Sequence, residues 1–266
     1  MCPIIDSHCH VYPDKIALKA AESIGVFYDT PIACNGMVST LLSEGEKAGI
    51  TNFVICSVAT TPHQVKSINN FIANTVKENP DKFTGLGTLH PDSETIKEDV
   101  EEIVSLGLKG VKLHPDFQKF AIDDKKCTEI YELCRGRLPI LFHTGDKRYD
   151  YSNPERIIPV LEAYEDLTVI GAHLGGWSVW EEASEKLCGY KNIYVDCSSS
   201  LYYMDSEKAT SLIRMYGADK VLFGVDYPMW YPKEELERFN KLSLTNEEKE
   251  KILYKNAAKL YNINLT

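Results

Sequence analysis

Short apolar runs alternate with longer amphipathic stretches along the whole chain, and this order limits its fold more than any other feature. The runs read PIIDSHCH, NFVICSVA, FTGLGTLH, GVKLHP, LPILFHTG, LTVIGAHL, NIYVDCSS and KVLFGVDYP. A strand followed by a helix, repeated in this way, is typical of a parallel sheet built from βα units. Eight such units in 266 residues match the usual size of a (β/α)8 barrel. The sequence therefore predicts an α/β fold, a single (β/α)8 TIM barrel domain over residues 1–266.

Helices are expected between these strands. They are predicted near residues 36–49, 64–79, 94–106, 124–135, 154–164, 178–187, 206–216 and 234–240, with a last one near 246–261. Starts such as SNPERIIPVLEAY place Ser, Asn or Pro where the amino ends of helices favour them. The segment from about Tyr12 to Asn35 is interpreted as a long loop after the first strand, a candidate lid.

The composition limits which partners the protein can bind and in which cellular compartment it is expected. A net charge of −10 argues against nucleic acid or an anionic membrane surface as the main partner. The eight cysteines form no CxxC motif, and several lie inside apolar runs, as reduced buried thiols do. No run approaches the ~20 apolar residues of a membrane span, and no secretory signal pattern precedes the first strand. We therefore expect a cytoplasmic protein that acts on a small molecule.

Polar residues that close the apolar runs are the candidate site. In barrels of this kind the chemistry lies at the carboxyl ends of the strands. His8 and His10 share one face of the first strand, because side chains alternate along a strand. His143, His173 and Asp226 close three later runs. A lone strand-end histidine is more often a hydrogen-bonded core residue, but the joint pattern predicts a catalytic metal site with room for a bound water.

The motifs IIDSHCH, ILFHTG, VIGAHLGG and FGVDYP, in this order, resemble the amidohydrolase superfamily. The resemblance spans nearly the whole chain and is closest to the amidohydrolase-related branch that includes aminocarboxymuconate semialdehyde decarboxylase. It implies a TIM barrel of the metallo-dependent hydrolase type in which His8, His10, His143 and Asp226 bind a divalent metal, with zinc as the expected ion. It also implies that His173 is either a ligand of a second metal or an acid/base group beside the metal. Relatives are often dimers, so a homodimer is one option.

Lys112, in GVKLHP, decides between one metal and two. In binuclear relatives a strand-four lysine is carboxylated and bridges two metals, and KLHP is similar to that environment. A mononuclear, decarboxylase-like member needs no bridge. Lys112 would then be neutralised by a nearby carboxylate or bind an anionic substrate.

Two enzymatic hypotheses follow from the same residues. The first is a hydrolase of an amide, lactone or ester that uses a metal-activated water, with Asp226 moving the proton and His173 stabilising the intermediate. The second is a metal-dependent non-oxidative decarboxylase of an unsaturated or aromatic acid, whose carboxylate Lys147 and Arg148 would hold. A binding or scaffold protein is a third interpretation, but it would be expected to have lost one of the five strand-end groups.

Aromatic residues after the later strands indicate the kind of substrate. Trp177 follows the sixth predicted strand and Trp230 the eighth, so both are candidates for the rim of the mouth. Such a rim suits a planar or apolar organic ligand. The alternative is that these rings pack loops onto the barrel or form a subunit interface.

Overall fold

The computed structural model describes residues 2–265. All strands pair in parallel, in two sheets of order β1-β2-β3 and β4-β5-β6-β7-β8-β9. The strands are β1 (Ile5–His10), β2 (Asn52–Cys56), β3 (Phe83–Gly85), β4 (Gly87–Thr88), β5 (Val111–Leu113), β6 (Ile140–Phe142), β7 (Val169–Gly171), β8 (Ile193–Asp196) and β9 (Val221–Leu222). The eight predicted runs each hold a strand, and the third holds both β3 and β4.

The two sheets are joined into one barrel by hydrogen bonds at both junctions. Between β3 and β4, the backbone N–H of Leu86 donates to the carbonyl of Ile55 at 2.9 Å. Between β9 and β1, Ser7 N–H donates to Phe223 O and His10 N–H to Tyr227 O, at 2.9 and 2.7 Å. The predicted (β/α)8 barrel is therefore confirmed.

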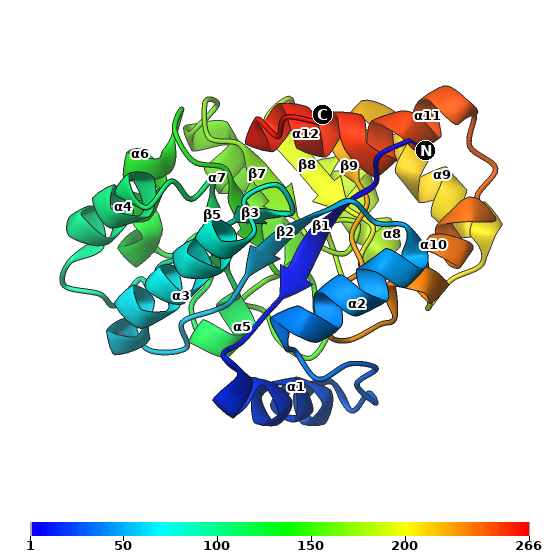
Figure 1. Ribbon diagram of the computed structural model, residues 1–266. Helices are drawn as coiled ribbons and strands as arrows, with labels where there is room; N and C mark the ends of the chain where they lie inside the picture. Colours follow the sequence, from blue (N-terminus) through cyan, green and yellow to red (C-terminus); the bar gives the residue numbers. More distant parts are fainter. Residues whose placement is uncertain (1, 266) are drawn as a thin grey trace.

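Helices surround the barrel (Figure 1). The α-helices are α1 (Asp14–Tyr28), α2 (Val38–Ala48), α3 (Val65–Glu78), α4 (Ile96–Ser105), α5 (Pro115–Gln118), α6 (Thr128–Cys134), α7 (Ile158–Ala163), α8 (Trp180–Leu187), α9 (Ser206–Tyr216), α10 (Pro232–Asn240), α11 (Asn246–Glu250) and α12 (Asn256–Tyr261). Short 3-10 turns η1 (Pro62–Gln64), η2 (Lys125–Cys127), η3 (Pro154–Ile157) and η4 (Ala218–Lys220) precede α3, α6, α7 and β9, and a π-helical turn, η5 (Lys251–Lys255), links α11 to α12. The helices predicted from the sequence are present; α1 and α5 were not predicted.

The interpretation of residues 12–35 as a loop is wrong. Most of this segment is α1, a 15-residue helix that lies across the carboxyl ends of the strands, away from both chain termini (Figure 1). Its buried face consists of Ala17, Ala21 and Gly25, spaced four residues apart. A side chain at Gly25 would meet Ile32 and the carbonyl of Thr30 at 2.8 Å, so small residues let the helix pack closely against the chain that follows it.

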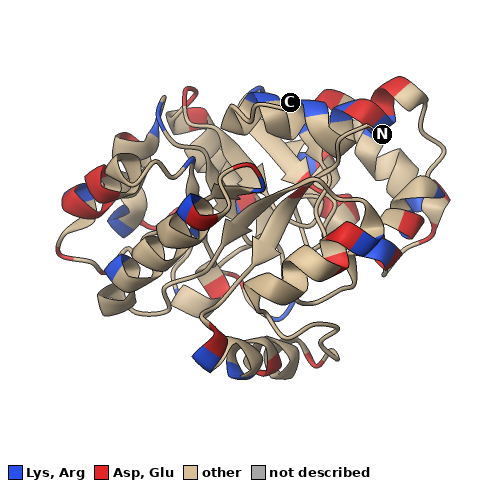
Figure 2. Cartoon of the chain, viewed as in Figure 1, with Lys and Arg blue, Asp and Glu red and all other residues tan. Residues whose placement is uncertain are grey.

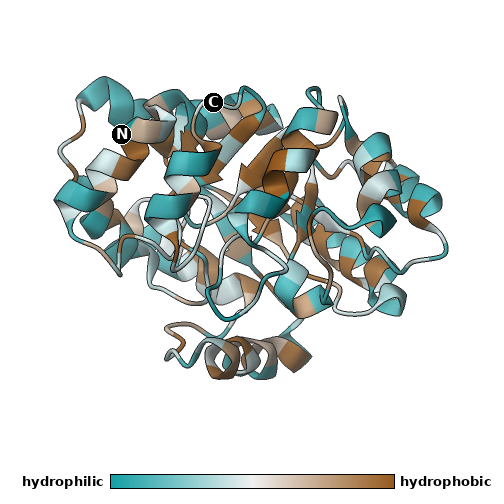
Figure 3. Cartoon of the chain, turned by 180° about the vertical axis from the view of Figure 1, so that it is seen from behind, coloured by the Kyte–Doolittle hydropathy of each residue, from teal (hydrophilic) through white to brown (hydrophobic). Residues whose placement is uncertain are grey.

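The core has two parts, one between the sheet and its helices and a smaller one inside the barrel. The inner part includes Ile5, Val54, Leu86, Leu141, Ile170 and Leu222, with Tyr261 of α12 packed beneath them. Hydrophobic residues gather on the strands while the outer helix faces are hydrophilic (Figure 3), and most charged residues lie on the helices and loops (Figure 2). Among the described residues, no helix is long and apolar enough to cross a membrane.

Candidate metal centre

His8 and His10 face each other at the carboxyl end of β1. Their Nε2 atoms are 3.1 Å apart, and the intervening Cys9 is buried in the outer core, as strand alternation predicts. The pairing of β1 with β2 shifts register between Asp6 and Cys9. The Asp6 carboxylate stabilises this irregularity, because its Oδ1 accepts the backbone N–H groups of His8 and Val225 at 3.1 and 2.9 Å.

Asp226 completes a group of three candidate ligands. Its Oδ1 lies 3.6 Å from Nε2 of both His8 and His10, and its backbone N–H donates to the carbonyl of His8 at 2.9 Å. Its φ of 66° turns the chain sharply after β9, which brings the carboxylate over β1. Atoms of His8, His10 and Asp226 that could bind one ion all lie within 4.8 Å of one another.

The chemistry of these donors fits a divalent cation. Asp196 Oδ2 accepts a hydrogen bond from Nδ1 of His8 at 2.9 Å, which leaves the lone pair of Nε2 directed at His10 and Asp226. Burial holds the pKa of His8 and of His10 well below the usual range, so both imidazoles are neutral. Neutral imidazoles and a carboxylate are typical ligands of zinc and related divalent ions.

His173 and His143 form a second pair beside this group. His173 donates from Nδ1 to the carbonyl of Ser198 at 3.0 Å, and its Nε2 lies 3.1 Å from Nδ1 of His143. Burial lowers the pKa of His173 to about 4. The His173 ring stacks on that of His8 with centroids 5.3 Å apart. Of the predicted ligands, His143 therefore lies next to His173 and outside the group formed by His8, His10 and Asp226.

His8, His173 and Asp196 also lie close together, but they form a hydrogen-bonded support and not a second ion site. Asp196 Oδ1 accepts from the backbone N–H groups of His173 and Ser198 and from the Ser198 hydroxyl, and its Oδ2 accepts from His8. With both oxygens committed, Asp196 orients the histidines.

Lys112 is fully buried inside the barrel on β5 and points at the metal centre. Its Nζ lies 3.1 Å from Nε2 of His8, and it makes no ion pair with a carboxylate of the described chain. Burial lowers the pKa of its ammonium group, which favours the neutral amine that carboxylation requires.

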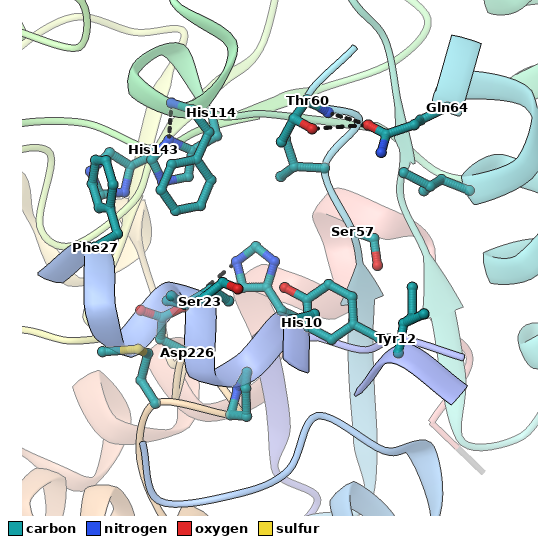
Figure 4. Close-up of a pocket in the computed structure, with 18 of the residues that line it drawn as sticks. His10, Tyr12, Ser23, Phe27, Ser57, Thr60, Gln64, His114, His143 and Asp226 are labelled. Atoms are coloured by element: carbon teal, nitrogen blue, oxygen red, sulfur yellow. Dashed lines mark hydrogen bonds and ion pairs between the residues drawn. The ribbon is translucent and has the colours of Figure 1, made fainter. Parts of the chain in front are cut away.

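A cavity of about 490 Å³ opens beside the histidines, between the strand ends and α1. Figure 4 shows His10, His114, His143 and Asp226 on its wall. The lining residues are His10, Tyr12, Pro13, Ile16, Ala20, Ser23, Ile24, Phe27, Tyr28, Ser57, Val58, Thr60, Gln64, Ser67, Ile68, Phe71, His114, Phe117, His143, His173, Asp226, Pro228 and Met229. Within the described chain, no lysine or arginine lines this cavity.

Tyr28, at the end of α1, places its hydroxyl at the histidines, and the sequence interpretation missed it. His114 Nδ1 accepts the backbone N–H of Phe117 at 3.3 Å, so its Nε2 carries hydrogen and donates to the Tyr28 oxygen at 2.9 Å. The Tyr28 hydrogen is then free for His143, whose Nε2 is 3.3 Å away, or for a ligand. The sequence feature that could have indicated Tyr28 is the helix start Pro13–Asp14, followed by small residues at every fourth position, which together predict a helix ending near Tyr28.

The four residues predicted to bind substrate differ in their distance from the metal centre. Trp177 lies near the centre, lining a narrow gap with Tyr28, His143 and Asp226. Lys147 is exposed on a separate surface depression. Trp230 is buried, and its Nε1 donates at 2.8 Å to the Ser199 hydroxyl, which in turn donates to Asp226 Oδ2 at 2.5 Å.

Arg148 is engaged by the protein itself. Its Nε and Nη2 donate to the Asp146 carboxylate at 2.9 and 2.7 Å, and its Nη1 donates to the carbonyl of Phe27 at 2.7 Å. Its guanidinium carbon lies 4.8 Å from the centre of the Phe27 ring. The residue thus ties the end of α1 to the loop after β6.

A family model and several solved structures match nearly the whole length of this chain. A family model described as Amidohydrolase matches residues 5–263. An uncharacterized TIM-barrel protein from Bordetella bronchiseptica is 26% identical, with a TM-score of 0.81, and the match covers 98% of this chain and 99% of that one. No curated protein sequence matches the chain.

Two more distant solved structures share the fold. A dihydroxybenzoic acid decarboxylase from Polaromonas sp., with bound manganese, is 16% identical, with a TM-score of 0.73 and coverage of 100% of this chain and 98% of that one. A protein assigned as a 2-pyrone-4,6-dicarboxylic acid hydrolase from Pseudomonas putida is 18% identical, with a TM-score of 0.69 and full coverage of both chains.

Proposed function

The chain belongs to the amidohydrolase family, and on this premise we propose that it is a metal-dependent hydrolase of a small neutral amide, lactone or ester. The observation that carries the proposal is the pairing of a donor cluster, His8, His10 and Asp226, with an adjoining cavity that no lysine or arginine lines. Beyond the metal centre and Lys112, no cationic side chain would balance a substrate carboxylate on the wall of this cavity, and an unbalanced buried charge is costly.

The donor cluster would hold the metal through Nε2 of His8, Nε2 of His10 and Asp226 Oδ1, with His143 and His173 as further ligands. A bound divalent ion supplies Lewis acidity, which polarises a carbonyl and lowers the pKa of water. Zinc is our choice, because an imidazole-rich donor set suits it. Manganese, the ion in the Polaromonas relative, is the alternative.

Asp226 is the proposed general base. With Oδ1 directed at the metal, Oδ2 accepts a hydrogen bond from Ser199 and keeps a second lone pair, which can take a proton from an attacking water and pass it to the leaving group. Burial raises the pKa of its carboxyl, which makes it a better proton acceptor than an exposed aspartate. Tyr28 lies where it can stabilise negative charge on the substrate oxygen by donating its hydroxyl hydrogen. His173 donates its Nδ1 hydrogen to Ser198, so its Nε2 presents a lone pair and is assigned to metal binding.

A decarboxylase is the second candidate, and one contact favours it. The His114 ring is sandwiched between Phe117 and His143, with centroid distances of 3.7 and 4.0 Å and interplanar angles of 5°. These three planar side chains all line the cavity, which suits an aromatic acid. Release of CO2 from a panel of aromatic and enoic acids, at rates above those of ester and amide hydrolysis, would move the assignment to this reaction.

Elemental mass spectrometry on protein purified without chelators or a histidine tag tests the metal centre. About one equivalent per chain indicates a mononuclear site, and about two indicate that carboxylated Lys112 bridges them. No metal, with none taken up on reconstitution, overturns the proposal.

Hydrolysis of neutral esters, lactones and amides tests the reaction. His8→Ala and Asp226→Asn are expected to abolish turnover, while His63→Ala, which changes an exposed histidine outside the cavity, keeps it. Unchanged turnover in either site variant would contradict the assignment.

Compartment and assembly are part of the proposal. All eight cysteines are free, and six of them are buried, which supports the reducing cytoplasm. A homodimer stays a prediction, which light scattering coupled to size-exclusion chromatography tests.

A further inference from the structure

The cavity continues from the metal centre to a second wall formed by η1 and α3. Apolar side chains of α1 and α3, including Ile24, Ile68 and Phe71, line the space between the two walls. On the second wall Thr60 and Gln64 face Asp226 and His10 across the cavity (Figure 4). The cavity volume is within the range of small-molecule sites, so one ligand can contact both walls.

The Gln64 side chain has one fixed orientation. Its Oε1 accepts the backbone N–H groups of Thr60 and Thr61 at 2.9 and 3.1 Å and the Thr60 hydroxyl at 3.0 Å. Backbone N–H groups only donate, so the atom that receives them is the oxygen, and the amide nitrogen is the other atom. Within residues 2–265 that nitrogen donates to no protein acceptor, and Figure 4 shows it turned toward the cavity.

We propose that Gln64 forms a distal subsite that binds a neutral oxygen acceptor, a ketone, ester, amide or ether oxygen, at the far end of an otherwise apolar substrate. This inference rests on the proposed function, since it assumes that the reacting group lies at the metal centre. It adds that the substrate carries a second polar group, separated from the first by an apolar segment that Ile24, Ile68 and Phe71 contact.

The chemistry of the subsite selects against a charged end. A carboxylate there would gain two N–H groups from Gln64 but would find no lysine or arginine in the cavity wall to balance its charge. The nearest cation along the chain, Lys66, is exposed on α3 and does not line the cavity. A neutral oxygen costs less to desolvate and is satisfied by the amide donors.

Three hydroxamates test the subsite, because a hydroxamate head chelates divalent metals and directs the tail into the cavity. They are octanohydroxamate, its analogue with a ketone next to the terminal methyl group, and the monohydroxamate of suberic acid. Their dissociation constants are measured by calorimetry on the metal-loaded protein, so the readout does not depend on turnover. We expect the ketone to bind about tenfold more tightly than the alkyl compound, and the acid to bind most weakly.

Gln64→Glu is the informative variant, because a carboxylate can still accept from Thr60 and Thr61 while the amide donors are lost. The tenfold preference for the ketone should disappear in this variant. Asn153→Asp is the matched control: Asn153 caps η3 by accepting the N–H of Glu155 at 3.0 Å and lies outside the cavity. It should bind the three ligands as the wild type does.

The outcomes separate the two proposals. Equal binding of the ketone and alkyl compounds, tight binding of the acid, or an unchanged preference in Gln64→Glu overturns the subsite, whether or not neutral esters are hydrolysed. Failure of all three hydroxamates to bind overturns the metal centre and the subsite with it. Ketone selectivity without hydrolysis of any neutral substrate supports the subsite and rejects the proposed reaction.

Discussion

The Asp196 carboxylate holds His8 from the side opposite the metal centre. Its Oδ2 lies 2.9 Å from Nδ1 of His8, although 188 residues separate the two in the chain. Because Nδ1 donates its hydrogen to Asp196, Nε2 presents a lone pair toward His10 and Asp226. This hydrogen bond selects the tautomer that a metal ligand needs.

Replacing Asp196 should therefore weaken metal binding without removing a ligand. Asp196→Asn is expected to lower the metal affinity by about 10- to 100-fold, measured by competition with a chromogenic chelator. Asp205→Asn is the control, since Asp205 accepts the backbone N–H of Lys208 and contacts no histidine. Unchanged affinity in Asp196→Asn would show that other contacts orient His8.

Tyr28 is expected to act on the reacting oxygen. Tyr28→Phe removes the only hydrogen of that hydroxyl while the ring packing stays, so kcat should fall by roughly 100-fold with a small change in KM. Tyr190→Phe provides the comparison, because its hydroxyl donates to Glu162 at 3.0 Å, away from the cavity. If kcat in Tyr28→Phe matched that of the wild type, Tyr28 would serve only to cover the site.

Arg148 should stabilise α1 over the cavity. Arg148→Ala removes its bonds to Asp146 and to the Phe27 carbonyl, so amide hydrogens of residues 14–28 should exchange faster in hydrogen–deuterium exchange mass spectrometry. Arg148→Lys should restore little protection, because an ammonium group cannot reproduce the forked contact. Lys147→Ala is the neighbouring control and should leave exchange in α1 unchanged; equal protection in all variants would exclude this role.

Glu235 should make stability depend on pH. It is buried on α10 and pairs with Arg238, yet burial raises the pKa of its carboxyl from 4.5 to about 7. The native state thus retains a proton that the unfolded state releases, and this contribution to stability is lost as pH rises through about 7.

Thermal unfolding checks this sign. From about pH 5 to about pH 8, the melting temperature of the wild type should fall relative to that of Glu235→Gln, which stays neutral throughout. Glu234→Gln, which alters an exposed partner of the same arginine, should keep the wild-type pH dependence. Parallel curves for the wild type and Glu235→Gln would contradict the raised pKa.

Local sequence patterns were sufficient to predict most of the strands and helices of the barrel. Apolar runs of strand length and the polar residues that close them predicted where His8, His10, His143, His173 and Asp226 would lie, because parallel strands bring their carboxyl ends to one side. The helix α1 was not predicted, because its buried face consists of the small residues Ala17, Ala21 and Gly25. Small residues give a weak hydrophobic period, and contacts such as that of Arg148 with Phe27 hold the helix in place.

The sequence by itself determined the number and order of βα units and the donor types at the strand ends, since both depend on residues close together in the chain. Only the tertiary structure decided which histidine nitrogen faces the centre, that Arg148 binds the end of α1, and that Gln64 presents its amide to the cavity. Each of these depends on hydrogen-bond geometry, and for His8 and Arg148 the partner lies more than a hundred residues away. A hydrogen-bond partner that is so distant in the chain cannot be predicted from a local sequence pattern.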